Sequence, residues 1–135
     1  MLANPLFQFP VRVYYEDTDA GGVVYHARYL HFFERARTEY LRTLDFSQQA
    51  LLNERNLAFV VKSMAIDYRF PARLDDLLSV ETEVSELKGA TILFTQWLKR
   101  DELILCTATV KVACVDLGKM KPMALPAEVK EAFLK

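Results

Sequence analysis

The stretch YLHFFERARTEYLRTL, residues 29–44, has the longest helical periodicity in the chain. Its apolar side chains recur every three or four residues, which places them on one face of a helix of roughly four turns. These apolar positions are Tyr29, Phe32, Phe33, Ala36, Tyr40 and Leu44. The other face carries charges of both signs, and we expect it to be solvated or ion-paired, for example between Arg35 and Glu39. Its members are Arg28, Glu34, Arg35, Arg37, Glu39 and Arg42.

Segments with the two-residue period of β-strands lie on both sides of this helix. Before it, residues 7–15 alternate between apolar and polar side chains. After it, the same alternation covers residues 63–70, 78–85 and 104–114, and a further strand is expected over residues 91–98. Short turns at Lys88-Gly89 and at residues 100–102 separate the last three segments, so we expect neighbouring strands to pair antiparallel.

Two shorter helices complete the predicted order of elements. Ser47 can cap a helix that continues to about Arg55, and Leu125-Pro126 opens a closing helix with apolar positions at Val129, Ala132 and Phe133. A strand, a long helix and then four strands are typical of an α+β fold rather than an α/β fold. We expect residues 1–135 to form one domain, in which a five-stranded antiparallel sheet wraps around the long helix.

Composition excludes several classes of function. The 135 residues are 52% hydrophobic, enough to bury a core, and 17 basic against 18 acidic side chains leave a net charge of −1. Without a basic field, nucleic acid is not an expected partner. The sequence also lacks an export signal and any apolar run of the ~20 residues that a transmembrane helix needs. We expect a cytoplasmic protein, with peripheral attachment at the inner membrane as a further possibility.

The two cysteines are predicted to be unpaired. Cys106 and Cys114 lie on one predicted strand, eight residues apart. At ~3.3 Å per residue their Cα atoms are separated by roughly 26 Å, whereas a disulfide requires about 7 Å or less. A CxxC motif is also absent, so we expect two buried, small apolar side chains and no metal site.

The segment just before the long helix concentrates the candidate chemistry. Residues 15–29 include three carboxylates, the Gly21-Gly22 pair and His26. Calcium binding of the EF-hand type fails, because the twelfth position counted from Asp17 is Arg28 and not a bidentate Glu. A phosphate-binding loop is disfavoured as well, since the G-x-x-x-x-G-K-[ST] pattern is missing and the acids would repel phosphate.

Two interpretations of this segment remain, and composition alone does not choose between them. One is a polar turn whose glycines, Gly22 among them, allow special backbone angles and whose acids favour a helix start. The other is a catalytic carboxylate that faces the amide N–H groups at a helix start, where an oxyanion could bind. A thioester suits the second, because its thiolate leaves without a strong general acid.

The segment DTDAGGVVYHARYLHFFERAR, residues 17–37, resembles the signature of hotdog-fold acyl-CoA thioesterases of the hydroxybenzoyl-CoA thioesterase type. More narrowly, it resembles their YbgC branch, which is associated with the bacterial Tol–Pal system. The similarity extends to YRFPARLDD, residues 68–76, and to KMKP, residues 119–122. It implies a hotdog fold, and the order of strands and helices read from periodicity agrees with that.

The resemblance also implies roles for individual residues. It carries the family's catalytic aspartate onto Asp19, and it places the oxyanion donors among the backbone amides of Tyr25 and His26. Asp19 would either attack the thioester carbonyl or activate a water molecule, and the sequence does not decide which. The His26 side chain would orient the carboxylate, the water or the sulfur, while Glu16 and Asp17 are expected to hydrogen bond within the loop.

The expected activity is hydrolysis of short-chain aliphatic acyl-CoA, without a cofactor. Arg73 and Lys88 are candidates for binding the CoA phosphates. The resemblance further implies a homo-oligomer, a dimer or a homotetramer, with active sites at the subunit interfaces. Two alternatives stay open: a hotdog acyl hydratase, and a module that binds acyl groups or acyl carrier protein in phospholipid metabolism.

Overall fold

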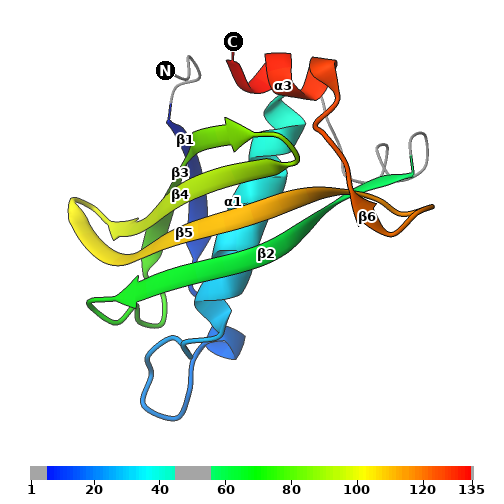
Figure 1. The fold of residues 1–135 in the computed structure, drawn as a ribbon. Coiled ribbons are helices and arrows are strands. Elements are labelled where there is room, and N and C mark those ends of the chain that lie inside the picture. Colours follow the sequence, from blue (N-terminus) through cyan, green and yellow to red (C-terminus); the bar gives the residue numbers. More distant parts are fainter. Residues whose placement is uncertain (1–5, 45–55, 135) are drawn as a thin grey trace.

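The computed structural model describes residues 6–44 and 56–134. Five strands form an antiparallel sheet in the order β1-β3-β4-β5-β2, and the short strand β6 pairs with β5. The strands are β1 (Phe7–Arg12), β2 (Leu57–Tyr68), β3 (Leu77–Lys88), β4 (Thr91–Arg100), β5 (Leu103–Asp116) and β6 (Lys121–Pro122). The predicted α+β class and the antiparallel pairing are confirmed (Figure 1).

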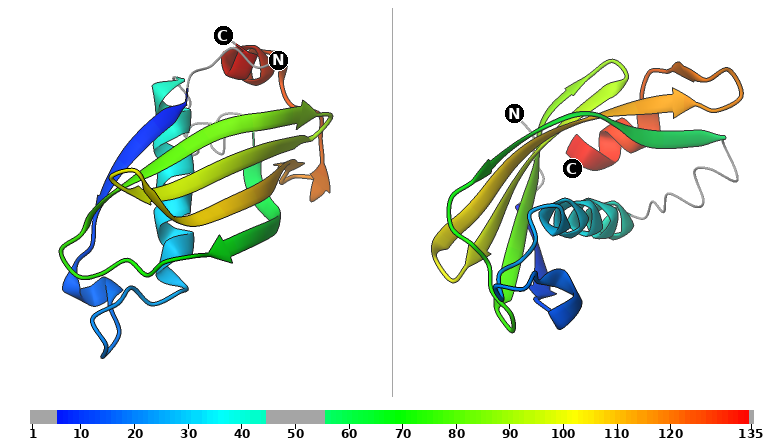
Figure 2. Two further views of the ribbon diagram at one scale, coloured as in Figure 1. Left: turned by 90° about the vertical axis from the view of Figure 1, so that its left-hand side faces the viewer. Right: turned by 90° about the horizontal axis from the view of Figure 1, so that it is seen from below.

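Helix α1 (Arg28–Thr43) lies in the concave face of this curved sheet, as the view from below in Figure 2 shows. The sheet bends partly because three strand pairs contain a register shift, at Val61/Ser63, Val84/Glu86 and Leu98/Lys99. This is the hotdog arrangement of one long helix wrapped by a sheet. The closing helix α3 (Ala127–Leu134) packs near the C-terminal end of α1, with Val129 and Phe133 buried. The short helix predicted from Ser47 to Arg55 lies outside the described residues.

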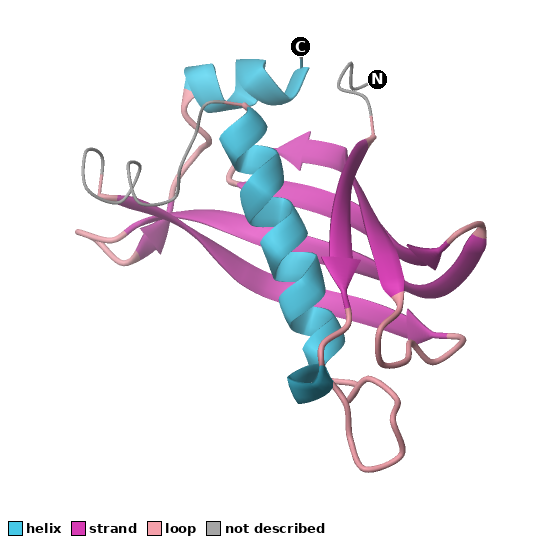
Figure 3. Ribbon diagram, turned by 180° about the vertical axis from the view of Figure 1, so that it is seen from behind, coloured by secondary structure: helices cyan, strands magenta, loops and turns pink. Residues whose placement is uncertain are grey.

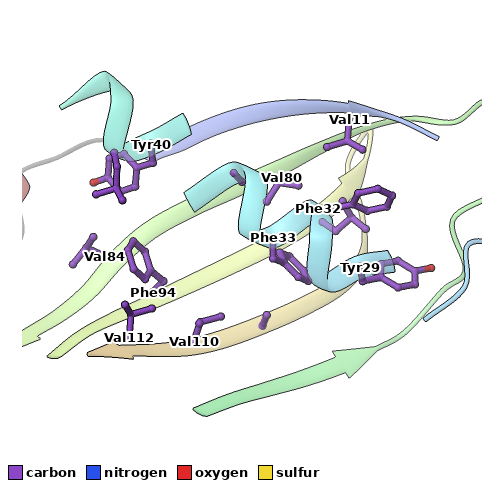
Figure 4. Packing of buried hydrophobic residues seen from close by; sticks show 14 of the residues in the cluster. Val11, Tyr29, Phe32, Phe33, Tyr40, Val80, Val84, Phe94, Val110 and Val112 are labelled. Atoms are coloured by element: carbon purple, nitrogen blue, oxygen red, sulfur yellow. The ribbon is translucent and has the colours of Figure 1, made fainter. Parts of the chain in front are cut away.

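The core forms between the apolar face of α1 and the inward-facing positions of the strands (Figure 4). Phe32, Phe33 and Ala36 have no exposed surface, and Val80 and Val110 meet them from the sheet. Burying each of the Phe and Val side chains contributes roughly 1.5–3 kcal/mol. The predicted inward parity is confirmed for β3 and, from Cys106 to Cys114, for β5. Near the start of β5 the buried residue is Leu105 and not the predicted Ile104, because the register with β4 shifts there.

The N-terminal alternation ends earlier than the sequence suggests. Strand β1 stops at Arg12, Val13 is still fully buried, and residues Tyr15–Asp17 form the 3₁₀ helix η1. Tyr15, predicted to share the buried parity, is 82% exposed. The chain turns here because the Asp17 carboxylate accepts a hydrogen bond from the Tyr14 N–H at 2.9 Å, which closes a local turn in place of another strand rung.

Arg37 is the main departure from the predicted charged face of α1. Its side chain is buried, with 7% exposed, and it donates to Gln96 Oε1 at 3.0 Å. Gln96, fully buried on β4, in turn donates to the Phe33 carbonyl and to Thr82 Oγ1. Burial lowers the pKa of the Arg37 guanidinium, and Glu34 partly opposes that effect. A solvated face was therefore the wrong prediction at this one position.

Replacing Gln96 with Leu should destabilise the protein by about 2–4 kcal/mol. The change leaves the Arg37 guanidinium, the Phe33 carbonyl and the Thr82 hydroxyl without their partner, and unsatisfied buried polar groups are costly. Urea unfolding followed by circular dichroism measures the effect. The same substitution at exposed Gln8 should change stability by about 0.5 kcal/mol or less. Equal stabilities of the two variants would contradict this prediction.

Candidate functional site

A tight hairpin connects η1 to the start of α1. The Tyr25 N–H donates to the Asp17 carbonyl at 3.0 Å, and the Asp19 N–H donates to the Val23 carbonyl at 2.9 Å. Between these two rungs lies an antiparallel bridge of Thr18 with Val24. Gly22, with φ of +78°, closes the turn in a conformation that favours glycine. The expected break in strand geometry is thus confirmed, and Gly22 has a backbone angle of the kind expected for the glycines of this turn.

The loop of residues 71–74 fixes this hairpin from the side. The Val24 N–H donates to the Ala72 carbonyl at 2.8 Å, and the Leu74 N–H donates to the Gly22 carbonyl at 3.2 Å. The Ala72 N–H in turn donates to the Tyr29 hydroxyl at 3.0 Å, which ties the same loop to α1. In Figures 1 and 3 the tip of the hairpin projects beyond the N-terminal end of α1, away from the sheet.

The three acids of the segment occupy different environments. Asp17 is buried, accepts the Tyr14 N–H and lies 3.8 Å from the Arg28 guanidinium, so its predicted structural role is confirmed. Glu16 is exposed. Asp19 is exposed at the hairpin tip, where its Oδ1 accepts the Gly21 N–H at 2.8 Å. This bond orients the carboxylate and leaves Oδ2 without a hydrogen bond among the described residues.

Helix α1 begins without a side-chain cap. Ala27 is the N-cap residue, and the Arg28, Tyr29 and Leu30 N–H groups turn back to the carbonyls three residues before them. In the described part of the chain, the N–H groups of His26 and Ala27 have no hydrogen-bond partner. Two adjacent donors therefore remain available at the positive end of the helix dipole, where negative charge is stabilised.

Of the two predicted oxyanion donors, the structure leaves one available. The Tyr25 N–H is engaged by the Asp17 carbonyl, so it cannot also serve an oxyanion without breaking the hairpin. The His26 N–H stays a prediction, and the Ala27 N–H joins it. The sequence did not predict Ala27, because whether a backbone N–H lacks a hydrogen-bond partner does not depend on the residue type. Asp19 lies on the opposite strand of the hairpin, two residues along from Asp17, the partner of Tyr25. With ~3.3 Å per residue along a strand and ~4.8 Å between strands, the Cα atoms of Asp19 and Tyr25 are roughly 8 Å apart.

Aromatic side chains surround His26. Its ring lies 4.5 Å from the Tyr25 ring and 6.4 Å from the Tyr68 ring, between centroids. Tyr68, at the end of β2, also packs edge-on against Tyr29 at 5.2 Å. Tyr25, Tyr68 and neighbouring Phe70 are each about half exposed, at 50%, 46% and 51%. The His26 side chain is itself exposed.

The two cations proposed for CoA lie at opposite ends of β3. Arg73 is exposed and forms an antiparallel bridge with Val23, so it lies beside the hairpin that carries Asp19. Lys88 is exposed at the far end of the 12-residue strand β3, about 36 Å from Leu77 at the near end, at ~3.3 Å per residue. One CoA held near Asp19 by one protomer could reach Arg73 but not Lys88 of the same protomer.

A family model described as the thioesterase-like superfamily matches residues 13–133, which include the hairpin, α1 and all strands from β2 to β6. The chain belongs to the thioesterase-like superfamily. It is 79% identical over 127 residues to the acyl-CoA thioesterase YbgC of Haemophilus influenzae, covering 94% of this chain and 93% of that protein. It is 57% identical over 129 residues to the acyl-CoA thioester hydrolase YbgC of Escherichia coli O6:H1, covering 95% and 96%.

Solved structures agree with this family. A probable thioesterase from Bartonella henselae superposes with a TM-score of 0.86 at 42% sequence identity, covering 90% of this chain and 100% of that one. The resemblance to the YbgC branch that residues 17–37 suggested is thereby confirmed. No helix in residues 6–44 or 56–134 is both long and apolar enough to cross a membrane.

A cavity of about 480 Å³ runs along one face of α1. It lies between α1 and strands β2, β4 and β5, and its lining begins at Leu30, one turn after His26, and reaches Leu41. Phe59 and Met64 of β2 line the cavity opposite α1, and Arg37 is also among its lining residues. In a member of the thioesterase-like superfamily, this largely apolar space next to the helix start is the natural candidate for an acyl group.

Neither cysteine is suited to act as a nucleophile in this protein. Cys106 and Cys114 are free and buried on β5, as predicted. Burial raises the pKa of Cys106 to about 12 and that of Cys114 to about 11. Both thiols are therefore protonated at neutral pH, and only a thiolate attacks efficiently.

The native protein should react with a thiol reagent such as dithiobis-nitrobenzoate at pH 8 far more slowly than the unfolded chain. Because both thiols are buried and their pKa values are raised, the reactive thiolate is scarce until unfolding exposes them. Absorbance of the released chromophore measures the reaction. Two thiols should appear after addition of denaturant. Rapid release of one equivalent from the native protein would contradict the prediction.

Proposed function

We propose that this chain hydrolyses the thioester of acyl-CoA, with Asp19 acting on the carbonyl carbon and the start of α1 binding the carbonyl oxygen. The relatives named acyl-CoA thioesterase and acyl-CoA thioester hydrolase support the reaction class. The observation that carries the mechanism is the pair of unengaged His26 and Ala27 amides beside a hairpin that presents an exposed carboxylate. Each such preorganised donor stabilises the developing oxyanion.

The reaction has two routes that use the same groups. In one, the Asp19 carboxylate attacks the carbonyl carbon, CoA leaves as thiolate, and water then hydrolyses the mixed anhydride to return the carboxylate. In the other, Asp19 accepts a proton from water, the hydroxide attacks, and the proton passes to the departing thiolate. Both convert acyl-CoA and water into a carboxylic acid and CoA. The His26 and Ala27 N–H groups stabilise the tetrahedral oxyanion in either route.

Substrate binding follows from the surroundings of the helix start. The acyl group extends from His26 into the cavity along α1, which is lined by Leu30, Phe59 and Met64 among others. Arg73, which forms a bridge with Val23 of the hairpin, is the candidate cation for a CoA phosphate. The same pantetheine thioester is carried by acyl carrier protein, so acyl-CoA and acyl-carrier-protein substrates have to be compared directly.

Replacing Asp19 with Asn should lower kcat for acyl-CoA hydrolysis by roughly 10²–10⁴-fold, since an amide neither attacks the carbonyl nor accepts a proton. Release of free CoA thiol from acyl-CoA of increasing chain length, and from acyl carrier protein, measures the activity. The Asp101→Asn variant is the matched control and should keep wild-type activity, because Asp101 is exposed at the β4–β5 turn.

Retained activity in the folded Asp19→Asn variant would overturn the role of Asp19. Wild-type protein that binds acyl-CoA without releasing thiol would instead favour a binding module. Hydration of an enoyl-CoA in place of thiol release would favour the hydratase.

We infer that the protein assembles through the open edge of β2. This strand is 12 residues long, ends the sheet order, and exposes Val60 and Val61 by 46% and 47%. A long edge strand with exposed apolar side chains is normally covered by another chain. Pairing of two β2 strands would join the sheets of two protomers into one continuous sheet.

The wild-type protein in solution should have a mass of two or more chains of 15.6 kDa each. The Val60→Lys variant should have the mass of a single chain. The introduced charge would be buried at the paired edge. Light scattering coupled to size-exclusion chromatography gives the mass. Gln8→Lys, on the opposite edge strand β1, should leave the assembly unchanged. An unchanged mass for Val60→Lys would show that β2 is not the interface.

A further inference from the structure

Tyr68 connects the edge strand β2 to the start of α1. Its hydroxyl donates a hydrogen bond to the His26 carbonyl at 3.1 Å, across 42 positions of sequence. No other side chain among the described residues has a hydrogen bond to the backbone of residues 25–27. The activity proposed above depends on the N–H groups of these same residues, so this contact lies directly behind the oxyanion donors.

Peptide geometry shows what the contact can control. In a trans peptide the carbonyl and the N–H point in opposite directions, so fixing the carbonyl also fixes the N–H. The Tyr25 carbonyl belongs to the same peptide as the His26 N–H, and the His26 carbonyl belongs to the same peptide as the Ala27 N–H. When these carbonyls point into the helix, the two N–H groups point out of its N-terminal end.

The first of these two peptides is held by the helix itself. The Arg28 N–H donates to the Tyr25 carbonyl at 2.8 Å, a short and therefore well-formed bond. The second peptide is held less firmly, because the hydrogen bond from the Tyr29 N–H to the His26 carbonyl is longer, at 3.3 Å. The Tyr68 hydroxyl, at 3.1 Å, supplies the second bond to this carbonyl.

Tyr68 is well placed to act as a fixed support. Its backbone pairs with Cys106 of β5, and its ring packs edge-on against Tyr29, which is almost fully buried. Burial raises the pKa of the Tyr68 hydroxyl, so the group keeps its proton, and its capacity to donate, across the physiological pH range. Since Tyr29 is part of α1, strand and helix hold the hydroxyl together.

We propose that Tyr68 is a positioning residue for thioester hydrolysis: its hydroxyl orients the His26–Ala27 peptide so that the Ala27 N–H acts as the second oxyanion donor. This inference rests on the proposed function. It predicts an effect on the transition state and not on binding of acyl-CoA, because the hydroxyl faces the carbonyl side of the peptide and the substrate oxygen meets the N–H side.

The test is the Tyr68→Phe variant, which removes the hydroxyl and keeps the ring that packs on Tyr29. We expect kcat to fall about 5- to 10-fold, the effect of one hydrogen bond, while KM and the melting temperature stay at wild-type values. Tyr15→Phe removes an equivalent hydroxyl from an 82% exposed side chain and should change none of the three quantities.

A spectroscopic measurement reports on the peptide itself. In ¹⁵N-labelled protein, titration with a ketone analogue of acyl-CoA, in which a methylene replaces sulfur, should shift the amide protons of His26 and Ala27 downfield. In Tyr68→Phe we expect the Ala27 shift to shrink and the His26 shift to persist. A purely structural role for Tyr68 would change neither the Ala27 shift nor kcat at equal melting temperature.

The outcomes separate this inference from the proposed function. If wild-type protein hydrolyses acyl-CoA and Tyr68→Phe does so with the same kcat and the same Ala27 shift, the positioning role is overturned and the thioesterase activity stands. If KM rises while kcat is unchanged, Tyr68 contacts substrate and the positioning role is again overturned. Absence of hydrolysis by wild-type protein would overturn the proposed function itself.

Discussion

The packing of one face of α1 against the concave side of the sheet fixes the position of everything at the start of that helix. Phe32, Phe33 and Ala36 are completely buried, so the helix cannot slide or rotate without opening the core. Tyr29, one turn from the helix start, is held by the same core and also accepts a hydrogen bond from Ala72. A rigid helix start is what allows backbone amides to be preorganised for an oxyanion.

Much of this architecture can be predicted from the spacing of apolar residues along the sequence. The three- and four-residue spacing in residues 29–44 defined α1 almost to the residue, and the parity of β3 and β5 identified their buried side chains. Turns at Lys88-Gly89 and at residues 100–102 gave the antiparallel order. These predictions held because hydrophobic burial on one face of an element dominates its energetics.

What periodicity does not contain is the identity of a distant hydrogen-bond partner. Arg37 has the pattern of a surface residue, yet Gln96, 59 positions later, holds it in the core. Tyr25 was expected to offer its amide, but the Asp17 carbonyl uses it. Asp19 could be named only through the family signature, because an Asx turn with Gly21 is also what an ordinary structural loop would form. Such pairings become visible only once the chain is folded.

The Tyr68 contact links the candidate site to the edge of the sheet. β2 pairs with β5 on one side, and no strand among residues 6–44 and 56–134 pairs with its other side. The hydrogen bonds of an edge strand open more readily than those of a strand that is paired on both sides. A strand paired to that edge would reduce the motion of β2, and with it the motion of the Tyr68 hydroxyl and of the His26–Ala27 peptide. Assembly through β2 would therefore also improve the preorganisation of the Ala27 amide, because the same strand forms the interface and carries Tyr68.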